Sequence, residues 1–306
     1  MNKAPILILA YNRPEKIAGL IDSLRPLAPS TVLVGVDGPR INIVNDAKKV
    51  AEVHKALELI NWTNNVQIRS RETNLGLKRA VVDSVDWAIN KYGKVIVIEE
   101  DVVVGKQFLD FMNEMLHLYS KEDSIGHISG YNVVPSKFIR TNGVRLSRYP
   151  ESIAWATWDR AWNNYDDQLY WGASCSIKDL REIVGSTLGA LKWKLNFLDA
   201  KNDRISTWAY RWIASMWSND QFAISPNLNL VTYTGSDSGS HSLTSAPWSE
   251  IPIGTIDLDL LSRESEIYFD ALAENWIKKS VFKESIPGVS KGILVSALRS
   301  ISHESH

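Results

Sequence analysis

Cysteine is almost absent from this sequence, with Cys175 alone among 306 residues. One cysteine excludes an internal disulfide framework and a cysteine-based zinc site, and it favours a reducing compartment. An excess of one charge is also missing, because 34 basic residues nearly balance 35 acidic ones and the formal net charge is -1. This balance argues against nucleic acid as a partner, since phosphate-binding proteins usually carry a clear basic excess.

Long apolar runs are missing as well. No stretch reaches the roughly 18 apolar residues that span a bilayer. The apolar run at residues 5–10 is too short, and too soon interrupted by Asn12 and Arg13, for a signal peptide. We therefore expect a cytoplasmic protein. Neither G-x-G-x-x-G nor G-x-x-x-x-G-K-[ST] follows this run, so neither a dinucleotide site nor a P-loop is supported.

The first hundred residues alternate between strand-like and helix-like patterns. Such alternation predicts an α/β fold with a mostly parallel sheet and right-handed crossovers, as in nucleotide-binding architectures. The expected strands cover residues 5–10, 31–36, 66–69 and 94–98, and the expected helices cover 14–24, 46–60, 77–90 and 108–118.

Beyond residue 124 the pattern changes to short strands, at 125–133 and 141–149, and then to a segment rich in tryptophan. Helices are expected at 180–198 and 206–219, and a strand at 222–231. We predict three regions: an α/β half at 1–124, a Trp-rich half at 125–257, and a helical tail at 258–306. The tail mixes lysines with apolar residues, a pattern that fits a core-packed helix, a partner or a membrane surface.

Three consecutive acids, Glu99, Glu100 and Asp101, end the apolar run that begins at Lys94. Such a run reads as a central strand covered on both faces, where an unpaired charge would cost several kcal/mol. The acids therefore belong where the strand emerges at the sheet's carboxyl edge, the place where open α/β sheets bind ligands. Their hard oxygens suit Mg²⁺ or Mn²⁺ holding a diphosphate.

Four stretches carry a family resemblance: Ile6 to Pro14, Val36-Asp37-Gly38, Asn74-Leu75-Gly76 and Val97 to Asp101. Together they resemble the GT-A-fold glycosyltransferases, and the most similar are bacterial sugar transferases related to the N-acetylglucosaminyltransferase I group. The resemblance continues in residues 155–166, which match W-A-T-W-x-x-A-W-x-x-Y-D, and in residues 235–241. It covers roughly residues 5–242, with Glu100 standing where the family commonly has aspartate.

The resemblance implies a nucleotide-sugar site and a divalent metal, Mn²⁺ or Mg²⁺. Asp101 is the expected metal ligand, with His241 as a second candidate. Glu100 is expected at the ribose or metal-bound water, and Glu99 as a structural acceptor. The remaining expected contacts to the nucleotide sugar come from Tyr11, Asn12, Arg13, Asp37, Gly38, Asn74, Lys78 and Arg79.

The resemblance makes residues 1–124 the nucleotide-sugar-binding half and residues 125–257 the acceptor half. The acceptor half is expected to offer aromatic faces to a saccharide or lipid-linked saccharide. Trp155, Thr157, Trp158 and Trp208 are the residues that the resemblance places there. Core packing is the competing interpretation for these tryptophans.

An inverting transferase also needs a general base beside the acceptor hydroxyl. The family's W-D-x-x-W motif corresponds here to Trp208 through Trp212, but Ala209 occupies the aspartate position. Three explanations remain: Ala209 replaces an aspartate, the protein is inactive, or another acid such as Asp203 or Asp220 serves. The otherwise intact motif favours the first.

The expected function is therefore metal-dependent, inverting glycosyl transfer in the cytoplasm, possible also at the inner face of the membrane through the tail. Two alternatives stay open. One is a noncatalytic saccharide-binding protein on the same scaffold, and the other is a nucleotidyltransferase, although the loop Tyr11-Asn12-Arg13-Pro14 lacks the Gly-rich, basic character usual in that class.

Overall fold

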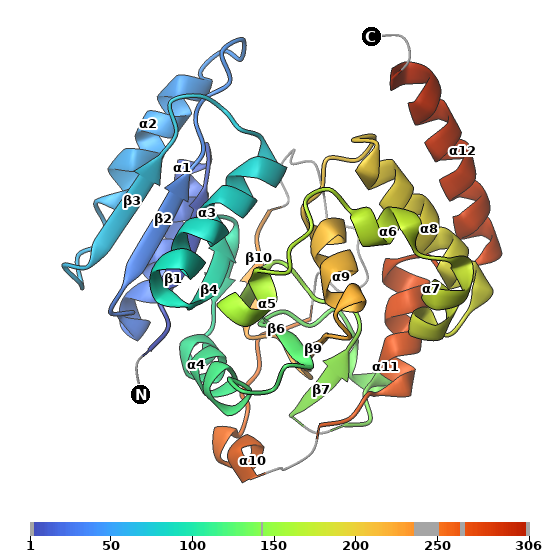
Figure 1. Cartoon of the computed structure of the whole chain (residues 1–306). Helices are drawn as coiled ribbons and strands as arrows, with labels where there is room; N and C mark the ends of the chain where they lie inside the picture. Colours follow the sequence, from blue (N-terminus) through green and yellow to red (C-terminus); the bar gives the residue numbers. More distant parts are fainter. Residues whose placement is uncertain (1–2, 142, 236–250, 264–266, 304–306) are drawn as a thin grey trace.

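The computed structural model describes residues 3–141, 143–235, 251–263 and 267–303. Across these residues an eight-stranded sheet forms the centre of the molecule, with strand order β3-β2-β1-β4-β8-β6-β9-β7 (Figure 1). Its strands are β1 (Ile6–Ala10), β2 (Val32–Val36), β3 (Val66–Ser70), β4 (Lys94–Glu99), β6 (Ile125–Ser129), β7 (Val144–Ser147), β8 (Ala154–Trp158) and β9 (Phe222–Pro226).

The sheet is mixed. Strands β3, β2, β1 and β4 are parallel, β8 is antiparallel to both β4 and β6, β9 is parallel to β6, and β7 is antiparallel to β9. A small antiparallel pair, β5 (Val102–Val104) with β10 (Val231–Tyr233), lies just beyond the end of β4.

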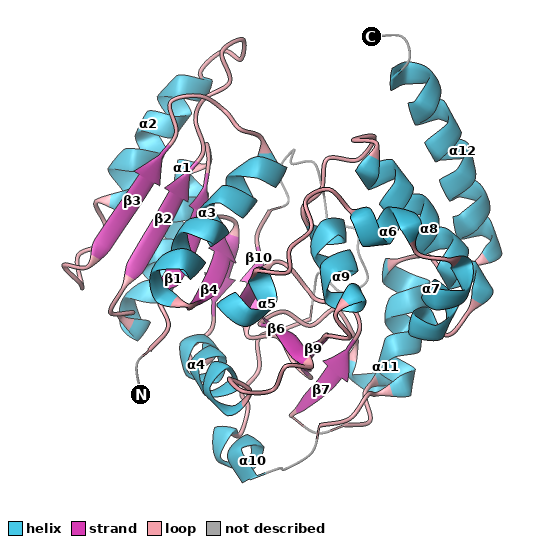
Figure 2. Ribbon diagram, viewed as in Figure 1, coloured by secondary structure: helices cyan, strands magenta, loops and turns pink. Residues whose placement is uncertain are grey.

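Helices cover the sheet and continue beyond it into a helical region (Figure 2). The α-helices are α1 (Pro14–Leu24), α2 (Asp46–Leu57), α3 (Leu77–Tyr92), α4 (Phe108–Leu118), α5 (Asp159–Trp162), α6 (Tyr170–Ser174), α7 (Ile177–Val184), α8 (Thr187–Lys201), α9 (Ala209–Ser218), α10 (Leu258–Arg263), α11 (Ala271–Trp276) and α12 (Ile286–His303). Short turns of other helix types are η1 (Arg25–Leu27), η2 (Ser136–Phe138) and η3 (Ile277–Val281).

Side chains alternate between two hydrophobic cores, one on each face of the sheet. On β4, Ile96 and Ile98 join the core that includes residues of α1, α2 and α4. Val95 and Val97 join the opposite core, which includes residues of α3, α5 and α9. Burial on both faces explains why these strands read as continuous apolar runs rather than as alternating ones.

The expected α/β fold is confirmed, two expected elements need correction, and one strand was missed. The helix expected at 180–198 is two helices, because Gly185 adopts φ 76° at the end of α7 and Ser186 caps α8. The strand expected at 222–231 is β9 and β10, which belong to different sheets. Residues 154–158 form a strand that the sequence did not suggest, and it lies between β4 and β6.

Candidate active site

The acid triplet lies at the carboxyl edge of the parallel strands. Leu9 of β1 is paired with Glu99 of β4, so the loops after both strands leave the sheet side by side. The loop after β1 contains Tyr11 and Arg13, and the loop after β4 contains Glu100 and Asp101. Parallel pairing therefore places the two most suggestive stretches of the sequence against each other.

Arg13 binds both of the buried acids. Its guanidinium donates a hydrogen bond to Oδ2 of Asp101, and its Nε lies 3.5 Å from Oε1 of Glu100. Burial opposes the charge on Arg13, but the two carboxylates raise its pKa. Arg13 thus stays a cation and compensates negative charge that the fold has removed from water.

Glu100 also fastens the first loop, because the backbone N–H of Tyr11 donates to its Oε2 at 2.6 Å. Burial raises the pKa of Glu100 to about 7, against the opposing effects of this hydrogen bond and of Arg13. Burial, together with Asp101 and Glu100, raises the pKa of Glu99 to about 8. Burial thus favours the protonated form of both glutamates, and more strongly for Glu99 than for Glu100.

The two carboxylate oxygens of Asp101 differ in their hydrogen-bond partners. Its Oδ2 accepts from Arg13, while its Oδ1 is buried and has no hydrogen-bond partner among the described residues. The backbone N–H and the hydroxyl of Thr234 donate to the Asp101 carbonyl, at 2.8 and 2.9 Å. Burial, together with the negative charge of Asp101, raises the pKa of Tyr233, whose hydroxyl hydrogen bonds to the Asp101 carboxylate.

A buried carboxylate oxygen without a partner needs an explanation, and a cation is one. Asp101 therefore fits the part expected of it, since Mg²⁺-type sites often use one or two carboxylates and complete the shell with phosphate and water. In the described part of the chain, no group of three or more His, Cys, Asp or Glu side chains is arranged to hold a metal by itself. His241, the second expected ligand, lies outside the described residues.

Asp46 connects the first loop to the turn after β2, and sequence reasoning missed it. It accepts from the Tyr11 hydroxyl, from Asn12 Nδ2 at 2.5 Å, and from the backbone N–H of Arg40 at 2.8 Å. Despite burial, these donors and the Arg40 side chain hold the pKa of Asp46 well below its usual range. The guanidinium of Arg40 also lies 5.6 Å from the centre of the Tyr11 ring. An acid in the first turn of α2 was the only local signal.

Asp37 organises a second loop at the same edge. Its carboxylate accepts from the backbone N–H groups of Leu75 at 2.8 Å and Gly76 at 3.2 Å, and from Asn74 Nδ2 at 2.9 Å. Gly38 is required here, because a Cβ on it would lie 2.4 Å from the Thr73 carbonyl carbon. The expected nucleotide contacts Asp37, Gly38 and Asn74 are thus brought together, with the Asp37 oxygens engaged in shaping the loop.

Lys78 and Asp203 join the sheet to the helical region. Nζ of Lys78, in the first turn of α3, lies 3.2 Å from Oδ1 of Asp203, and Nη2 of Arg211 lies 3.3 Å from the same oxygen. Despite some burial, both cations lower the pKa of Asp203. Arg79, the neighbouring expected contact, is exposed on the surface.

The expected acceptor residues lie in the core, which corrects that prediction. The side chains of Trp155, Thr157, Trp158 and Trp208 are at most 4% exposed. Trp155 stacks on Trp208 with ring centres 5.2 Å apart. Thr157 donates to the Gly126 carbonyl at 2.7 Å. Because β8 is a central strand, its aromatic faces meet protein on both sides, and a sugar has no access to them in this conformation.

Ala209 is the first residue of α9 and is partly buried. It packs against the core that contains Trp155, Trp162 and Trp208. Trp155 is paired with Val97, two residues before the triplet, so Ala209 lies toward the same end of the sheet as the acids. Asp203, paired with Lys78, is toward this end as well.

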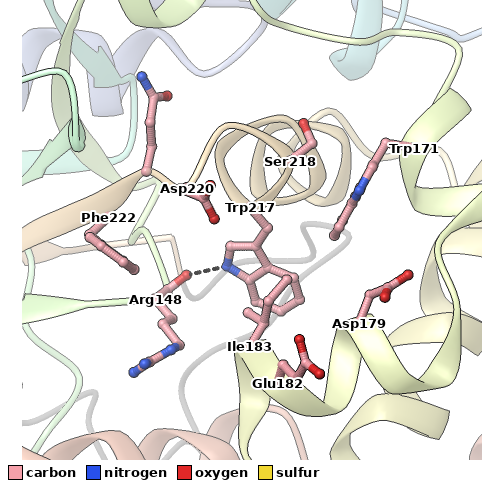
Figure 3. Close-up of a pocket in the computed structure, with 10 residues that line it drawn as sticks. Arg148, Trp171, Asp179, Glu182, Ile183, Trp217, Ser218, Asp220 and Phe222 are labelled. Atoms are coloured by element: carbon pink, nitrogen blue, oxygen red, sulfur yellow. Dashed lines mark hydrogen bonds between the residues drawn. The ribbon is translucent and has the colours of Figure 1, made fainter.

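Asp220 lies at the other end of the sheet. It precedes β9, which runs in the same direction as β4 through β6 and β8, so Asp220 is near the amino edge of the strands. It lines a cavity of about 390 Å³ together with Trp171, Glu182 and Trp217 (Figure 3). This position removes Asp220 as a general base for chemistry at the acid triplet.

Comparison with known proteins places this chain in no established family. No family model matches it, and no curated protein matches it. Among solved structures, one of UDP-glucose pyrophosphorylase complexed with UDP-glucose is similar, with a TM-score of 0.33, 10% identity, and coverage of 53% of this chain and 78% of that chain. Similarity this low carries no argument about function, and the resemblance to the N-acetylglucosaminyltransferase I group gains no support from it.

Proposed function

We propose that the protein is a glycosyltransferase that uses a nucleotide sugar as donor and a saccharide or lipid-linked saccharide as acceptor. One observation carries this proposal: the buried acids Glu100 and Asp101, at the carboxyl end of the central strand, are clamped by Arg13 and leave Asp101 Oδ1 without a described partner. Buried charge of this kind is expensive to maintain, and it lies where open α/β sheets bind their ligands.

In the proposed site, Asp101 Oδ1 would hold a divalent cation such as Mn²⁺ or Mg²⁺. The cation would supply Lewis-acid stabilisation of the departing diphosphate. Arg13 is the nearest fixed positive charge in the first loop, and we assign it to the orientation of the diphosphate. The loops fastened by Asp37 and Asp46 border the space assigned to the nucleoside.

The base for acceptor activation is the open part of the proposal. Asp203 is the remaining acidic candidate, and its ion pairs with Lys78 and Arg211 favour the charged form that a base requires. An aspartate at position 209 would be a second solution. If neither serves, the scaffold binds a saccharide donor without turning it over.

A nucleotidyltransferase is a second candidate, because Arg13 and a cation held by Asp101 would also bind the phosphates of a nucleoside triphosphate, although the first loop has no other basic residue and lacks the glycines usual in that class. The two reactions release different products. Glycosyl transfer releases a nucleoside diphosphate, whereas nucleotidyl transfer from a nucleoside triphosphate and a sugar phosphate releases pyrophosphate.

A thermal-shift screen of nucleoside diphosphates, their sugars and nucleoside triphosphates, with and without Mn²⁺, tests the proposal. A ligand at about one hundred times its Kd stabilises the folded state by about 2.7 kcal/mol, which is easily detected. We expect a nucleotide sugar with Mn²⁺ to raise the melting temperature, and Asp101→Asn to abolish the shift. Asp110→Asn, on the exposed side of α4, is the matched control.

If no nucleotide stabilises the protein under either condition, the proposal is wrong. Where a nucleotide sugar binds, assays for diphosphate and pyrophosphate release separate the two reactions. The variants Ala209→Asp and Asp203→Asn then address the base. A positioned base contributes about 10²- to 10⁴-fold, so the first should raise turnover by that order if position 209 is the base position.

A further inference from the structure

Helix α12 presents an apolar face to the outside of the molecule. Ile286, Ile293, Leu294 and Leu298, here called the outer face, are 69%, 52%, 66% and 66% exposed. Their spacing places them on one side of a helix of 3.6 residues per turn. Large apolar side chains grouped in this way on a surface mark an interaction site.

The opposite side of α12 is packed, which fixes the direction of the outer face. Val289 is 6% exposed, and the Ser296 hydroxyl donates to Oδ1 of Asp199 at 2.6 Å. These contacts attach α12 along α8, whose own Leu188 and Leu191 are 36% and 39% exposed. The outer face is therefore a property of the folded chain rather than of a loose tail.

Basic residues accompany the apolar ones. Residues 277–303 contain five, namely Lys278, Lys279, Lys283, Lys291 and Arg299, and one acid, Glu284. Glu284 is 9% exposed and accepts from Trp193 Nε1 at 3.0 Å and from the Tyr149 hydroxyl at 3.1 Å, so it does not offset the surface charge. A cavity of about 360 Å³ beside the start of α12 is lined by Lys278, Lys279 and Leu188, with Glu284 in its wall.

We propose that the outer face of α12 lies on an anionic lipid bilayer. An apolar stripe bordered by lysines is the pattern by which helices lie in the interface plane, with acyl chains meeting the stripe and lipid phosphates meeting the cations. In the described part of the chain, no helix is both long and apolar enough to cross a membrane. The interaction inferred is thus one of contact with the surface of a bilayer.

A second copy of this chain fits the face less well. In a symmetric dimer the same patch would face itself, which would bring the lysines of one copy close to those of the other, while Glu284, the one acid of residues 277–303, is buried. An anionic bilayer supplies the complementary charge. Figure 1 shows α12 on the far side of the molecule from β3, so the bilayer would meet the helical region and leave the acid triplet accessible.

Sedimentation with lipid vesicles tests this inference, and it does not depend on the enzymatic proposal. We expect the protein to sediment with vesicles of phosphatidylcholine mixed with phosphatidylglycerol, weakly with phosphatidylcholine alone, and less as salt rises. The double change Leu294→Glu and Leu298→Glu should lower partitioning by at least about a hundredfold, given the transfer free energy of two leucines. Each of Lys279→Gln and Lys291→Gln should lower it about fivefold.

The matched control is Ile41→Glu with Val44→Glu, two side chains 88% and 87% exposed that lie before α2. This variant should bind vesicles like the wild type, apart from a small effect of net charge. Unfolding midpoints verify that every variant is folded. No binding of the wild type to anionic vesicles, or undiminished binding of the leucine variant, overturns the inference. The inference is also overturned if the wild type is a dimer, the leucine variant is a monomer, and neither binds vesicles.

Discussion

Asp46 and Asp37 show how single carboxylates shape the loops of the candidate site. Each is nearly buried, and each fastens a loop that follows a strand of the parallel sheet. Loops with many backbone donors need such acceptors because their N–H groups have no strand partner. The loops of the proposed site are therefore held in place by two acids, and the nucleotide contact expected of Asp37 stays a prediction.

The sequence identified Asp37 through its position after a strand, but it gave no reason to select Asp46. Its partners Tyr11 and Arg40 are distant in sequence, and their meeting depends on how β1 and β2 pair.

Conversely, Trp155 and Trp158 were predicted at the site because aromatic side chains suit sugars. Burial in a central strand decides against that interpretation, and burial is not visible in residue type.

His127 makes stability depend on pH. It is fully buried, stacks on Trp155 with ring centres 5.2 Å apart, and lies between the Glu151 carbonyl and Trp212 Nε1. Burial lowers its pKa to about 3. A group with a depressed folded pKa contributes stability above its unfolded pKa, near 6.5, and this contribution is lost as pH falls toward the folded value.

We therefore expect His127 to reduce the unfolding free energy by about 2 kcal/mol between pH 7 and pH 5. At pH 7 the unfolding free energy of His127→Gln should be lower than that of the wild type, but it should fall less between pH 7 and pH 5. Urea unfolding at the two pH values measures both effects. His117→Gln, at an exposed histidine of α4, should keep the wild-type slope. Buried Glu151, whose pKa is raised to about 8 by burial, acts in the opposite direction in all three proteins. An unchanged slope in His127→Gln would contradict the assignment.

At the scale of elements, periodicity located the βα units well and failed where a unit is broken. Helix α3 and strand β4 follow their apolar patterns closely. The predicted helix over 180–198 overlooked the break at Gly185 and Ser186, although glycine followed by serine is a typical end and start of helices. Strand β8 was missed because its tryptophans and alanines are compatible both with a sugar-binding motif and with core packing.

Gly185 and Gly19 offer a matched test of the helix break. Gly185 adopts φ 76° at the end of α7, where an added Cβ is strained whatever the space around it. Gly19 lies inside α1, and nothing is within 4 Å of the position of its Cβ. We expect Gly185→Ala to lower the unfolding free energy by about 1 kcal/mol and Gly19→Ala to raise it by about 0.5 to 1 kcal/mol. Chemical unfolding of both variants checks the signs, and equal effects would exclude a backbone explanation.

In the whole molecule, one continuous sheet joins the regions before and after the change of sequence pattern near residue 124. Strand β8 comes from the second region and pairs with β4 of the first, and β6 pairs with β8 in turn. The two halves therefore share backbone hydrogen bonds and both hydrophobic cores. The boundary near residue 124 stays a prediction, and the sequence pattern could not show that the later strands return to extend the earlier sheet.

This continuity predicts that the two halves unfold together. Without β8, the Lys94–Glu99 strand would expose an apolar edge and lose the partner of Val97. Only Trp62 and Trp87 of the twelve tryptophans precede residue 124, so fluorescence reports mainly on the second half, whereas far-ultraviolet circular dichroism reports on both. We expect the two signals of the full chain to give coincident urea transitions, the behaviour of one cooperative unit. A circular-dichroism transition that continues after the fluorescence change is complete would show that residues before 124 form a separately stable domain.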